Sequence, residues 1–498
     1  MSTTGARGAA CERAVLDAVA TRLYIAGVWR DGSGDATVAV EDPATGETIA
    51  TVADGTAEDA LAALTAAHET FATWRETPPR ERGEILRRAY ETIVGRADEL
   101  ALLMTLEMGK PVPESRAEVT YAAEFLRWYA EEAVRIDGRF TTHQAGGGRL
   151  LTMRQPVGPC VFITPWNFPL AMGTRKIGPA IAAGCTMVVK PAKLTPLSML
   201  ALAQVFEEVG LPAGVLNVIT SSASGRVMEP LIRDPRTRKL SFTGSTEIGR
   251  TLMEQASEQL LRLSMELGGN APFVVFEDAD LDDALDGAMI AKMRNVGEAC
   301  TAANRFHVHE SLADAFAAGL AERMGALKIG RGTEDGVEVG PLIDEGQLEK
   351  VGELVDDAVV RGARVLCGGE RVPGPGHFFK PTVLADVPAD ARLLREEIFG
   401  PVAPVRAFAT EDEAVAAAND TEFGLVAYLY TSDLARAVRV SERLETGMVG
   451  LNQGLVSNAG APFGGIKHSG FGREGGPEGI QEYLEVKYVA IASPAGPP

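Results

Sequence analysis

Short apolar runs alternate with helical patterns from residue 159 onward, and this alternation constrains the fold more than any other feature of the sequence. Strands that alternate with helices over short connections form parallel sheets with helices on both faces. A second alternating block runs from residue 272 to about 450. We therefore expect an α/β fold with two parallel sheets, and ligands should bind at the carboxyl ends of the strands. The apolar runs of the first block are CVFI (160–163), TMVVK (186–190), VLNVI (215–219) and KLSF (239–242).

The chain before this block is predicted to hold short strands over residues 23–53 and helices over residues 57–135. In residues 57–74, and again in residues 80–109, apolar side chains recur at i, i+3 and i+4, which is the spacing of one face of a helix.

One later helix carries start and stop signals. Thr195 is expected to cap it, with Pro196 at its first position and Gly210 at its end. Proline just inside a helix and glycine just past it are the usual residues at these places.

Two polar segments that alternate like strands lie outside both blocks, at residues 138–158 and 479–492. Exposed edge strands usually need to be covered. We expect these segments to form a small sheet that pairs with another subunit.

Composition excludes several classes of protein. The chain is 46% hydrophobic, and its formal net charge of −20 argues against nucleic-acid and anionic-membrane partners. No apolar run is long enough to span a bilayer, and no signal peptide is seen. The five cysteines do not form the regularly spaced pattern of a disulfide framework, which fits a reducing, cytoplasmic location with free thiols. His307 and His309 alternate as strand residues do, so no metal site is predicted.

The segment NVGEACTAANRF (295–306) contains Cys300, a possible nucleophile. Alone it could equally be a small buried residue, since most free cysteines are inert. Asn167 follows the first strand of the sheet in the stiff loop TPWNFP and could donate to an oxyanion. Glu266 stands between Met265 and Leu267, where apolar neighbours should raise its pKa toward that of a general base.

Other loops at strand ends suit an anionic cofactor. SFTGSTEIG (241–249) turns from a strand into a helix at Gly244 and Ser245, and such a helix start binds phosphate. VVKPAKLTP (188–196) places Lys190 and Lys193 at another strand end. GFGREG (470–475) matches a glycine-rich dinucleotide pattern but lacks the strand and helix around it, so we predict a turn there.

These motifs together resemble the aldehyde dehydrogenase superfamily from about residue 23 to residue 490. The resemblance implies two parallel-sheet, Rossmann-like α/β domains and a small β oligomerisation flap. It divides the chain into a cofactor-binding domain (1–137 and 159–265), a catalytic domain (266–453) and oligomerisation strands (138–158 and 475–498). The motifs that carry it are PWNFP, KPA, FTGSTEIG, MELGGNAPFVVF, the Cys300 segment, EEIFGP and PFGGIKHSGFGRE.

The resemblance implies a role for each of three residues in aldehyde oxidation. Cys300 attacks the aldehyde, and Asn167 with the Cys300 N–H holds the oxyanion of the thiohemiacetal. Hydride transfer to NADP or NAD leaves a thioester, which water activated by Glu266 hydrolyses. The implied cofactor-binding residues are Trp166, Asn167, Lys190, Pro191, Ala192, Lys193, Gly244, Ser245, Leu267, Glu397 and Phe399.

Within the superfamily the sequence is similar to succinate-semialdehyde dehydrogenases. Arg175, Arg294 and Ser457 match the residues that grip the distal carboxylate of the substrate in that family, and arginine forks suit carboxylates. Each arginine alone could be a helix-pairing residue. The alternative substrates are a longer ω-carboxy semialdehyde or a broad range of aldehydes. The chain is expected to form a homodimer or a homotetramer, and the sequence does not decide between the two.

Three positions depart from the family pattern. Glu298 stands where many members have glutamine, and it would disfavour a thiolate unless its side chain points away. Ala302 replaces a second cysteine, so a local disulfide is absent. Lys193 replaces a glutamate in the KPA motif, and we expect it to attract a 2′-phosphate and favour NADP over NAD.

Two readings from other classes are weaker. A thiol hydrolase built on Cys300 would need an activating base, usually histidine, and His307 is too close in sequence. A non-catalytic scaffold would have no need to keep Cys300, Glu266 and Asn167 together.

Overall fold

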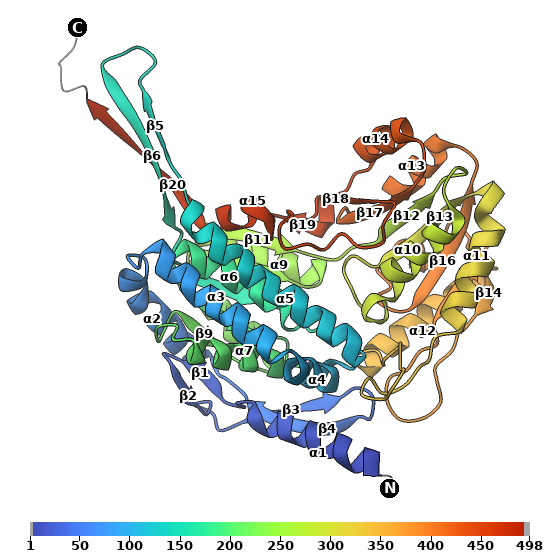
Figure 1. The fold of residues 1–498 in the computed structure, drawn as a ribbon, viewed down its shortest axis with the longest axis horizontal. Helices are drawn as coiled ribbons and strands as arrows, with labels where there is room; N and C mark the ends of the chain where they lie inside the picture. Colours follow the sequence, from blue (N-terminus) through green and yellow to red (C-terminus); the bar gives the residue numbers. More distant parts are fainter. Residues whose placement is uncertain (1–2, 493–498) are drawn as a thin grey trace.

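The protein contains two large, mostly parallel sheets, one small three-stranded antiparallel sheet and one two-stranded sheet (Figure 1), which confirms the predicted α/β class. The computed structural model describes residues 3–492. Within that range no helix is both long and apolar enough to cross a membrane. Residues 1–2 and 493–498, which the predicted domain limits included, lie outside the described range.

The first sheet has eight strands in the order β19-β11-β10-β7-β8-β9-β1-β2. Its five central strands are parallel, and β1, β2 and β19 run antiparallel to their neighbours. The strands are β1 (Leu23–Ile25), β2 (Val28–Arg30), β7 (Cys160–Ile163), β8 (Met187–Lys190), β9 (Leu216–Val218), β10 (Lys239–Thr243), β11 (Arg262–Glu266) and β19 (Gly470–Phe471). The helices from the same part of the chain are α2 (Ala57–Trp74), α3 (Pro79–Gly95), α4 (Ala97–Met108), α5 (Val112–Glu132), α6 (Ala171–Ala183), α7 (Leu197–Glu208), α8 (Ser224–Ile232) and α9 (Thr246–Ser257).

The second sheet has seven strands in the order β14-β15-β16-β13-β12-β17-β18, and only the β14–β15 pair is antiparallel. Its strands are β12 (Ala271–Val275), β13 (Ala303–His309), β14 (Arg364–Cys367), β15 (Thr382–Ala385), β16 (Val402–Phe408), β17 (Val426–Tyr430) and β18 (Met448–Leu451). The helices are α10 (Leu281–Met293), η2 (Arg294–Gly297), α11 (Glu310–Gly325), α12 (Glu345–Val360), η3 (Arg392–Leu394), α13 (Glu411–Asn419) and α14 (Leu434–Arg443).

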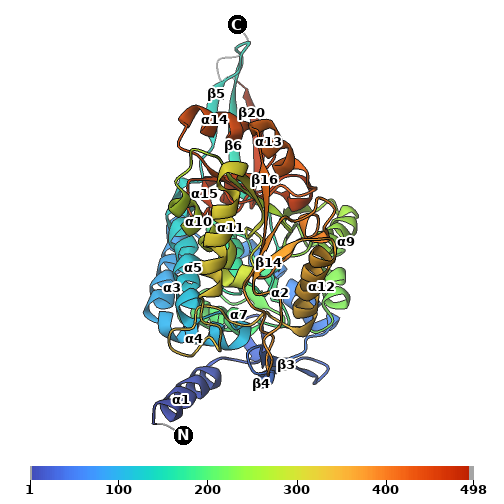
Figure 2. The same ribbon diagram turned by 90° about the vertical axis from the view of Figure 1, so that its right-hand side faces the viewer.

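The small sheet projects from the body of the molecule as a long flap (Figures 1 and 2). It consists of β5 (Arg139–Thr142), β6 (Gly148–Pro156) and β20 (Leu484–Ala492), and β6 pairs with β20 along its whole length. Residues 476–481 form a helix, so the prediction of strand throughout 475–498 was wrong there; Pro477 suits the first turn of a helix. The remaining elements are α1 (Thr3–Ala18), β3 (Thr37–Asp42), β4 (Glu47–Ala53), η1 (Ala133–Arg135), η4 (Lys467–Ser469) and α15 (Gly476–Gln481).

Two helix predictions need correction. The pattern over residues 80–109 is interrupted at Arg96, whose φ of −108° and ψ of 21° separate α3 from α4. The helix expected to begin at Pro196 begins at Leu197, and Thr195 does not cap it. The buried carboxylate of Glu107, from α4, accepts the free N–H groups of Leu197 and Ser198 at 2.7 and 2.8 Å. A helix start can be satisfied from a distant element, which local sequence does not show.

Glu118, from α5, plays the same part at the start of α6. Its Oε1 accepts the N–H groups of Leu170 and Ala171 at 3.0 and 3.1 Å, while its Oε2 pairs with Lys110 Nζ at 2.6 Å. All of these groups are buried. The α4–α5 hairpin therefore sets the position of α6, which follows β7, and of α7, which follows β8.

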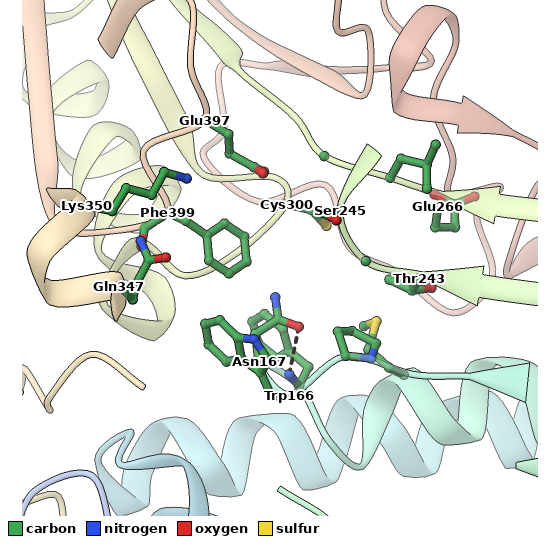
Figure 3. A pocket seen from close by; sticks show the side chains of 16 residues that line it. Trp166, Asn167, Thr243, Ser245, Glu266, Cys300, Gln347, Lys350, Glu397 and Phe399 are labelled. Atoms are coloured by element: carbon green, nitrogen blue, oxygen red, sulfur yellow. Dashed lines mark hydrogen bonds between the residues drawn. The ribbon is translucent and has the colours of Figure 1, made fainter. Parts of the chain in front are cut away.

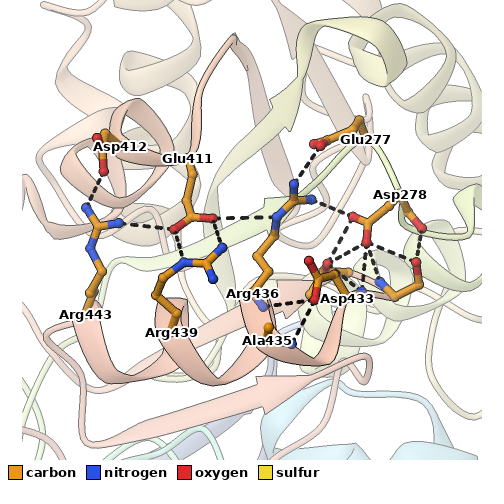
Figure 4. A network of polar contacts seen from close by, with 11 residues as sticks. Glu277, Asp278, Glu411, Asp412, Asp433, Ala435, Arg436, Arg439 and Arg443 are labelled. Atoms are coloured by element: carbon orange, nitrogen blue, oxygen red, sulfur yellow. Dashed lines mark hydrogen bonds and ion pairs between the residues drawn. The ribbon is translucent and has the colours of Figure 1, made fainter.

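A network of ion pairs, far from the hairpin, fixes α14 to the second sheet (Figure 4). Arg436, Arg439 and Arg443 all lie on the face of α14 that meets Glu411 at the start of α13. Arg436 also bonds Asp278 at 2.8 Å and lies over the Phe276 ring at 4.5 Å. Charged side chains thus replace much of the apolar face that a surface helix usually buries.

Candidate active site

A cavity of about 210 Å³ lies at the carboxyl ends of the first-sheet strands, and the Cys300 segment and the 397–399 loop close its other side (Figure 3). The loop after β7 contributes Trp166 and Asn167, and the turn after β10 contributes Gly244 and Ser245. The predicted site residues that line this cavity are Trp166, Asn167, Gly244, Ser245, Glu266, Leu267, Cys300, Glu397 and Phe399.

Sequence reasoning missed several residues of the cavity wall. Gln347 and Lys350 come from α12, where they are ordinary polar residues on a helix, so no local pattern marks them. Gln347 Nε2 donates to the backbone oxygens of Ile398 and Phe399 at 3.0 and 2.8 Å. It therefore helps to hold the loop that carries Glu397 and Phe399.

Cys300 is partly buried at the centre of the cavity. Burial raises the pKa of its thiol to about 12, against the lowering effect of the Arg175 and Arg294 charges; Glu397 and Glu266 raise it further. The thiol is therefore neutral at rest, and positive charge around it favours the thiolate that a nucleophile requires.

Glu266 ends β11 with a buried carboxyl group whose two oxygens accept no hydrogen bond from residues 3–492. Burial, together with the charge of Glu474, raises the pKa of Glu266 well above its ordinary value. A carboxyl group without partners in an apolar wall is free to exchange a proton with a ligand, as a general base does.

Glu474 lies in the predicted GFGREG turn, and sequence reasoning gave it no role. It is buried and pairs with Lys176 and with Arg175, whose Nε lies 2.9 Å from Glu474 Oε2. Although burial opposes it, these two cations keep the pKa of Glu474 below its usual range. The negative charge of Glu474 therefore adds to the effect of burial in raising the pKa of Glu266.

Asn167 is held rigidly against the Cys300 segment. Its Nδ2 donates to the Glu298 carbonyl at 3.0 Å, and its Oδ1 accepts from Phe168 N at 3.1 Å. The buried Lys110 donates to the Asn167 carbonyl at 2.7 Å. A side-chain amide fixed near the nucleophile is the geometry expected of an oxyanion donor.

The backbone before Cys300 is strained. Asn295 and Val296 both have φ of 53°, a left-handed conformation that β-branched valine rarely adopts. Asn295 N donates to Glu114 Oε2 of α5 at 2.8 Å, and Asn295 Nδ2 donates to the Asn167 carbonyl at 3.1 Å. Contacts from two other elements therefore impose the conformation that presents the thiol.

Glu298 points away from the thiol, so the concern raised by its sequence position does not apply. Its buried Oε1 accepts from Ile343 N at 3.1 Å. Burial raises the pKa of Glu298 well above the ordinary value.

The cavity wall fits a dinucleotide. Ser245 caps α9, so the start of this helix faces the cavity. Gly244 has no side chain there, and a Cβ at this position would lie 2.4 Å from the Phe242 ring. Trp166 and Phe399 meet edge to face at 5.4 Å between ring centroids. Glu397 accepts from Gly269 N at 2.9 Å, and burial raises its pKa to about 7. These groups offer an anion-binding helix start, flat apolar walls and a carboxyl group for hydroxyls.

The predicted KPAK residues, Lys190, Pro191, Ala192 and Lys193, lie outside this cavity. Exposed Lys193 lines a separate cavity of about 280 Å³. Lys190 is buried, and burial together with the Lys193 charge lowers its pKa to about 8.

The three predicted substrate residues lie beside the cavity, though none lines it. Arg294 Nη1 donates to Ser457 Oγ at 3.2 Å, and the Arg294 guanidinium lies over the Phe168 ring at 4.7 Å. Arg175 is 2% exposed and stacks on Phe463 at 4.0 Å. Its Nη2 has no hydrogen-bond partner among residues 3–492.

Comparison with known proteins gives a single answer. The aldehyde dehydrogenase family profile matches residues 29–489. The chain is 59% identical over 446 residues to a succinate-semialdehyde dehydrogenase of Paenarthrobacter nicotinovorans, covering 90% of this chain and 99% of the relative. It is 52% identical over 472 residues to a glutarate-semialdehyde dehydrogenase of Pseudomonas putida, covering 95% and 98%. The crystal structure of an Escherichia coli NADP dependent enzyme superposes with a TM-score of 0.94 at 50% identity, covering 95% and 98%. The chain therefore belongs to the aldehyde dehydrogenase family.

Proposed function

We propose that this protein oxidises succinate semialdehyde to succinate with NADP or NAD as hydride acceptor. The observation that supports a carboxylated substrate is that Nη2 of buried Arg175, near the Arg294–Ser457 pair, has no hydrogen-bond partner among the described residues. A buried guanidinium nitrogen without an acceptor is costly, and a carboxylate satisfies it better than a neutral group does. The name of the Paenarthrobacter relative supports this substrate.

In the proposed mechanism, the Cys300 thiol loses its proton to solvent, and the resulting Sγ thiolate bonds to the aldehyde carbon. The carbonyl becomes an oxyanion, which Asn167 Nδ2 and the Cys300 N–H stabilise. A nicotinamide held in the cavity would supply the acceptor for the hydride that leaves the aldehyde carbon, and a thioester would remain on Cys300. Ionised Glu266 then takes a proton from water as the hydroxyl adds to the thioester, and the carbon–sulfur bond breaks to release the acid and the thiol.

Trp166, Gly244, Ser245, Leu267, Glu397 and Phe399 are proposed to hold the cofactor in the cavity that they line. The α9 start would take the phosphates, and Glu397 would take hydroxyls of a ribose. The segment from Lys190 to Lys193 would bind the part of the cofactor that extends beyond this cavity, with Lys193 in the second cavity that it lines.

The name of the Pseudomonas putida relative supports a second substrate, glutarate semialdehyde. The test is kcat/KM for succinate semialdehyde, glutarate semialdehyde and butanal. A hundredfold preference for a carboxylated aldehyde over butanal, about 2.7 kcal/mol, supports the carboxylate clamp. Equal values would make the protein a general aldehyde dehydrogenase.

NADP is proposed as the preferred cofactor because Lys193 is exposed and carries no ion pair within residues 3–492. Lys193→Glu should lower the ratio of kcat/KM for NADP to that for NAD by at least tenfold, since a carboxylate repels the 2′-phosphate. Steady-state rates with both cofactors measure this ratio. Lys487→Glu, the same charge change at an exposed position of β20 on the flap, should leave the ratio unchanged. An unchanged ratio in the Lys193 variant would remove the basis for the preference.

The flap is proposed to join copies of the chain into a dimer or tetramer. Val486 and Tyr488 of β20 and Phe140 of β5 are 63%, 58% and 63% exposed, which is unusual for apolar side chains on one small sheet. Tyr488→Glu should dissociate the oligomer because a charge buried in an apolar contact is costly. Light scattering after size exclusion measures the mass. Val360→Glu, at a site 88% exposed on α12, is the control, and a monomeric wild type would contradict the proposal.

A further inference from the structure

A second cavity, of about 80 Å³, lies on the second sheet and shares no residue with the catalytic cavity. Arg305 and His307 occupy alternate positions of β13, so their side chains lie on one face of the sheet. Arg406 stands opposite His307 in the register of β13 with β16. We name this second cavity the β13–β16 cavity. The residues that line it are Arg305, His307, Ala389, Leu394, Arg395, Arg406, Ala417 and Asp420.

The Arg305 guanidinium is buried without a carboxylate of its own. It donates to the carbonyl oxygens of Asn270, Ala417 and Ala418 at 3.0, 2.8 and 2.8 Å. Burial lowers its pKa to about 10, which leaves it charged at neutral pH. A buried charge bonded only to neutral acceptors is costly unless a counter-ion lies near.

The one acid of the cavity is already engaged. Asp420 Oδ1 and Oδ2 lie 3.1 and 3.0 Å from the guanidinium nitrogens of Arg395, in a two-point contact. Three guanidinium groups face this single carboxylate, so the β13–β16 cavity has two uncompensated positive charges in a chain whose net charge is −20.

Two lining side chains also lack protein partners. The guanidinium group of Arg406 makes no hydrogen bond or ion pair with the described residues, although its backbone belongs to the β13–β16 pairing. His307 is 4% exposed, and its buried Nε2 has no hydrogen-bond partner among the described residues. Burial and the two neighbouring arginines lower the pKa of His307 to about 3, so it is neutral. A neutral imidazole offers one N–H donor, which a bound anion could accept.

We propose that the β13–β16 cavity binds one small tetrahedral dianion of the phosphate or sulfate type. Two uncompensated positive charges match two negative charges, and planar guanidinium forks suit such oxygens. A volume of about 80 Å³ is several times the roughly 15 Å³ that one water needs on the same measure. It accommodates a compact oxyanion rather than a nucleotide. This inference does not depend on the proposed substrate.

Calorimetric titration of the full-length protein with sodium sulfate, at constant ionic strength kept with sodium chloride, tests the site. We expect saturable binding of one sulfate per chain. Arg406→Gln should raise the dissociation constant at least tenfold, and Arg406→Lys, which keeps the charge but loses the fork, should raise it less. Lys193→Gln should bind sulfate as the wild type does, because Lys193 belongs to another cavity.

Inorganic phosphate and phenyl phosphate distinguish a free ion from a phosphoryl group on a larger molecule. Binding of phosphate alone supports a free ion, whereas equal binding of both, lost in Arg406→Gln, supports a phosphoryl group held by the same residues. No saturable binding in the wild type, or binding lost in Lys193→Gln and kept in Arg406→Gln, would overturn the proposal. Circular dichroism and thermal unfolding of each variant confirm that it is folded.

Discussion

Glu266→Gln is expected to release one equivalent of reduced cofactor per active site and then nearly stop. Glutamine cannot take the proton from water, so the thioester should persist on Cys300 while the earlier steps continue. Loss of a general base lowers turnover by about 10²- to 10⁴-fold. Stopped-flow fluorescence of the reduced cofactor measures the burst, and mass spectrometry of the quenched protein detects the acylated chain.

The dependence of kcat on pH should also arise from Glu266. Because the pKa of Glu266 lies well above the ordinary carboxyl value, the group keeps its proton in mildly acidic solution. The kcat of the wild type should rise with pH as Glu266 ionises, and this rise should be absent in the glutamine variant.

Glu298→Gln is the matched control, since it changes a second buried carboxyl group close in sequence to Cys300, one that accepts from Ile343 N and points away from the thiol. It should retain steady turnover and the pH dependence of the wild type. Unchanged steady-state turnover in Glu266→Gln, with no burst, would assign the base to another group.

Arg294→Gln is expected to lower kcat/KM for succinate semialdehyde by about 30- to 150-fold and to change that for butanal by no more than a few-fold. The loss reflects one charge-assisted hydrogen bond to the distal carboxylate, worth about 2 to 3 kcal/mol. Steady-state kinetics with the two aldehydes measure the difference. Equal losses for both would show that Arg294 supports the fold of the Cys300 segment and not the choice of substrate.

Arg364→Gln on β14 removes the same charge from an exposed position and controls for long-range attraction of an anionic substrate. Arg175→Gln should behave differently from Arg294→Gln, because Arg175 also pairs with Glu474 beside the proposed base. We expect it to impair oxidation of both aldehydes, and that of succinate semialdehyde more strongly.

Alternation of strands and helices was enough to predict both large sheets, because parallel strands require crossover connections. It could not show that Gly470 and Phe471 return to the first sheet after the chain has built the second. Nor could it place the start of α7, since the acceptor for its first N–H groups is Glu107, about 90 residues earlier. Helix ends and sheet edges depend on such distant groups.

The candidate site was predictable where its chemistry lies in short motifs. Cys300, Asn167 and Glu266 stand in distinctive loops, and the structure brings all three to one cavity. Lys110, Glu114 and Glu474 act through contacts with segments 50 to 300 residues away. The tilt of a side chain such as Glu298 depends on Ile343, so its charge could not be inferred from position alone.

The α4–α5 hairpin has a consequence for the order in which the chain is made. Glu107 and Glu118 accept hydrogen bonds from N–H groups of segments synthesised about 50 to 90 residues later. Glu114 accepts from Asn295 N, which is synthesised 181 residues later. Until those segments emerge from the ribosome, three carboxylates stay hydrated on the growing chain and keep an otherwise apolar hairpin soluble. The nucleophile loop should be among the last parts to settle, so half-finished chains would carry no reactive thiol in its strained setting.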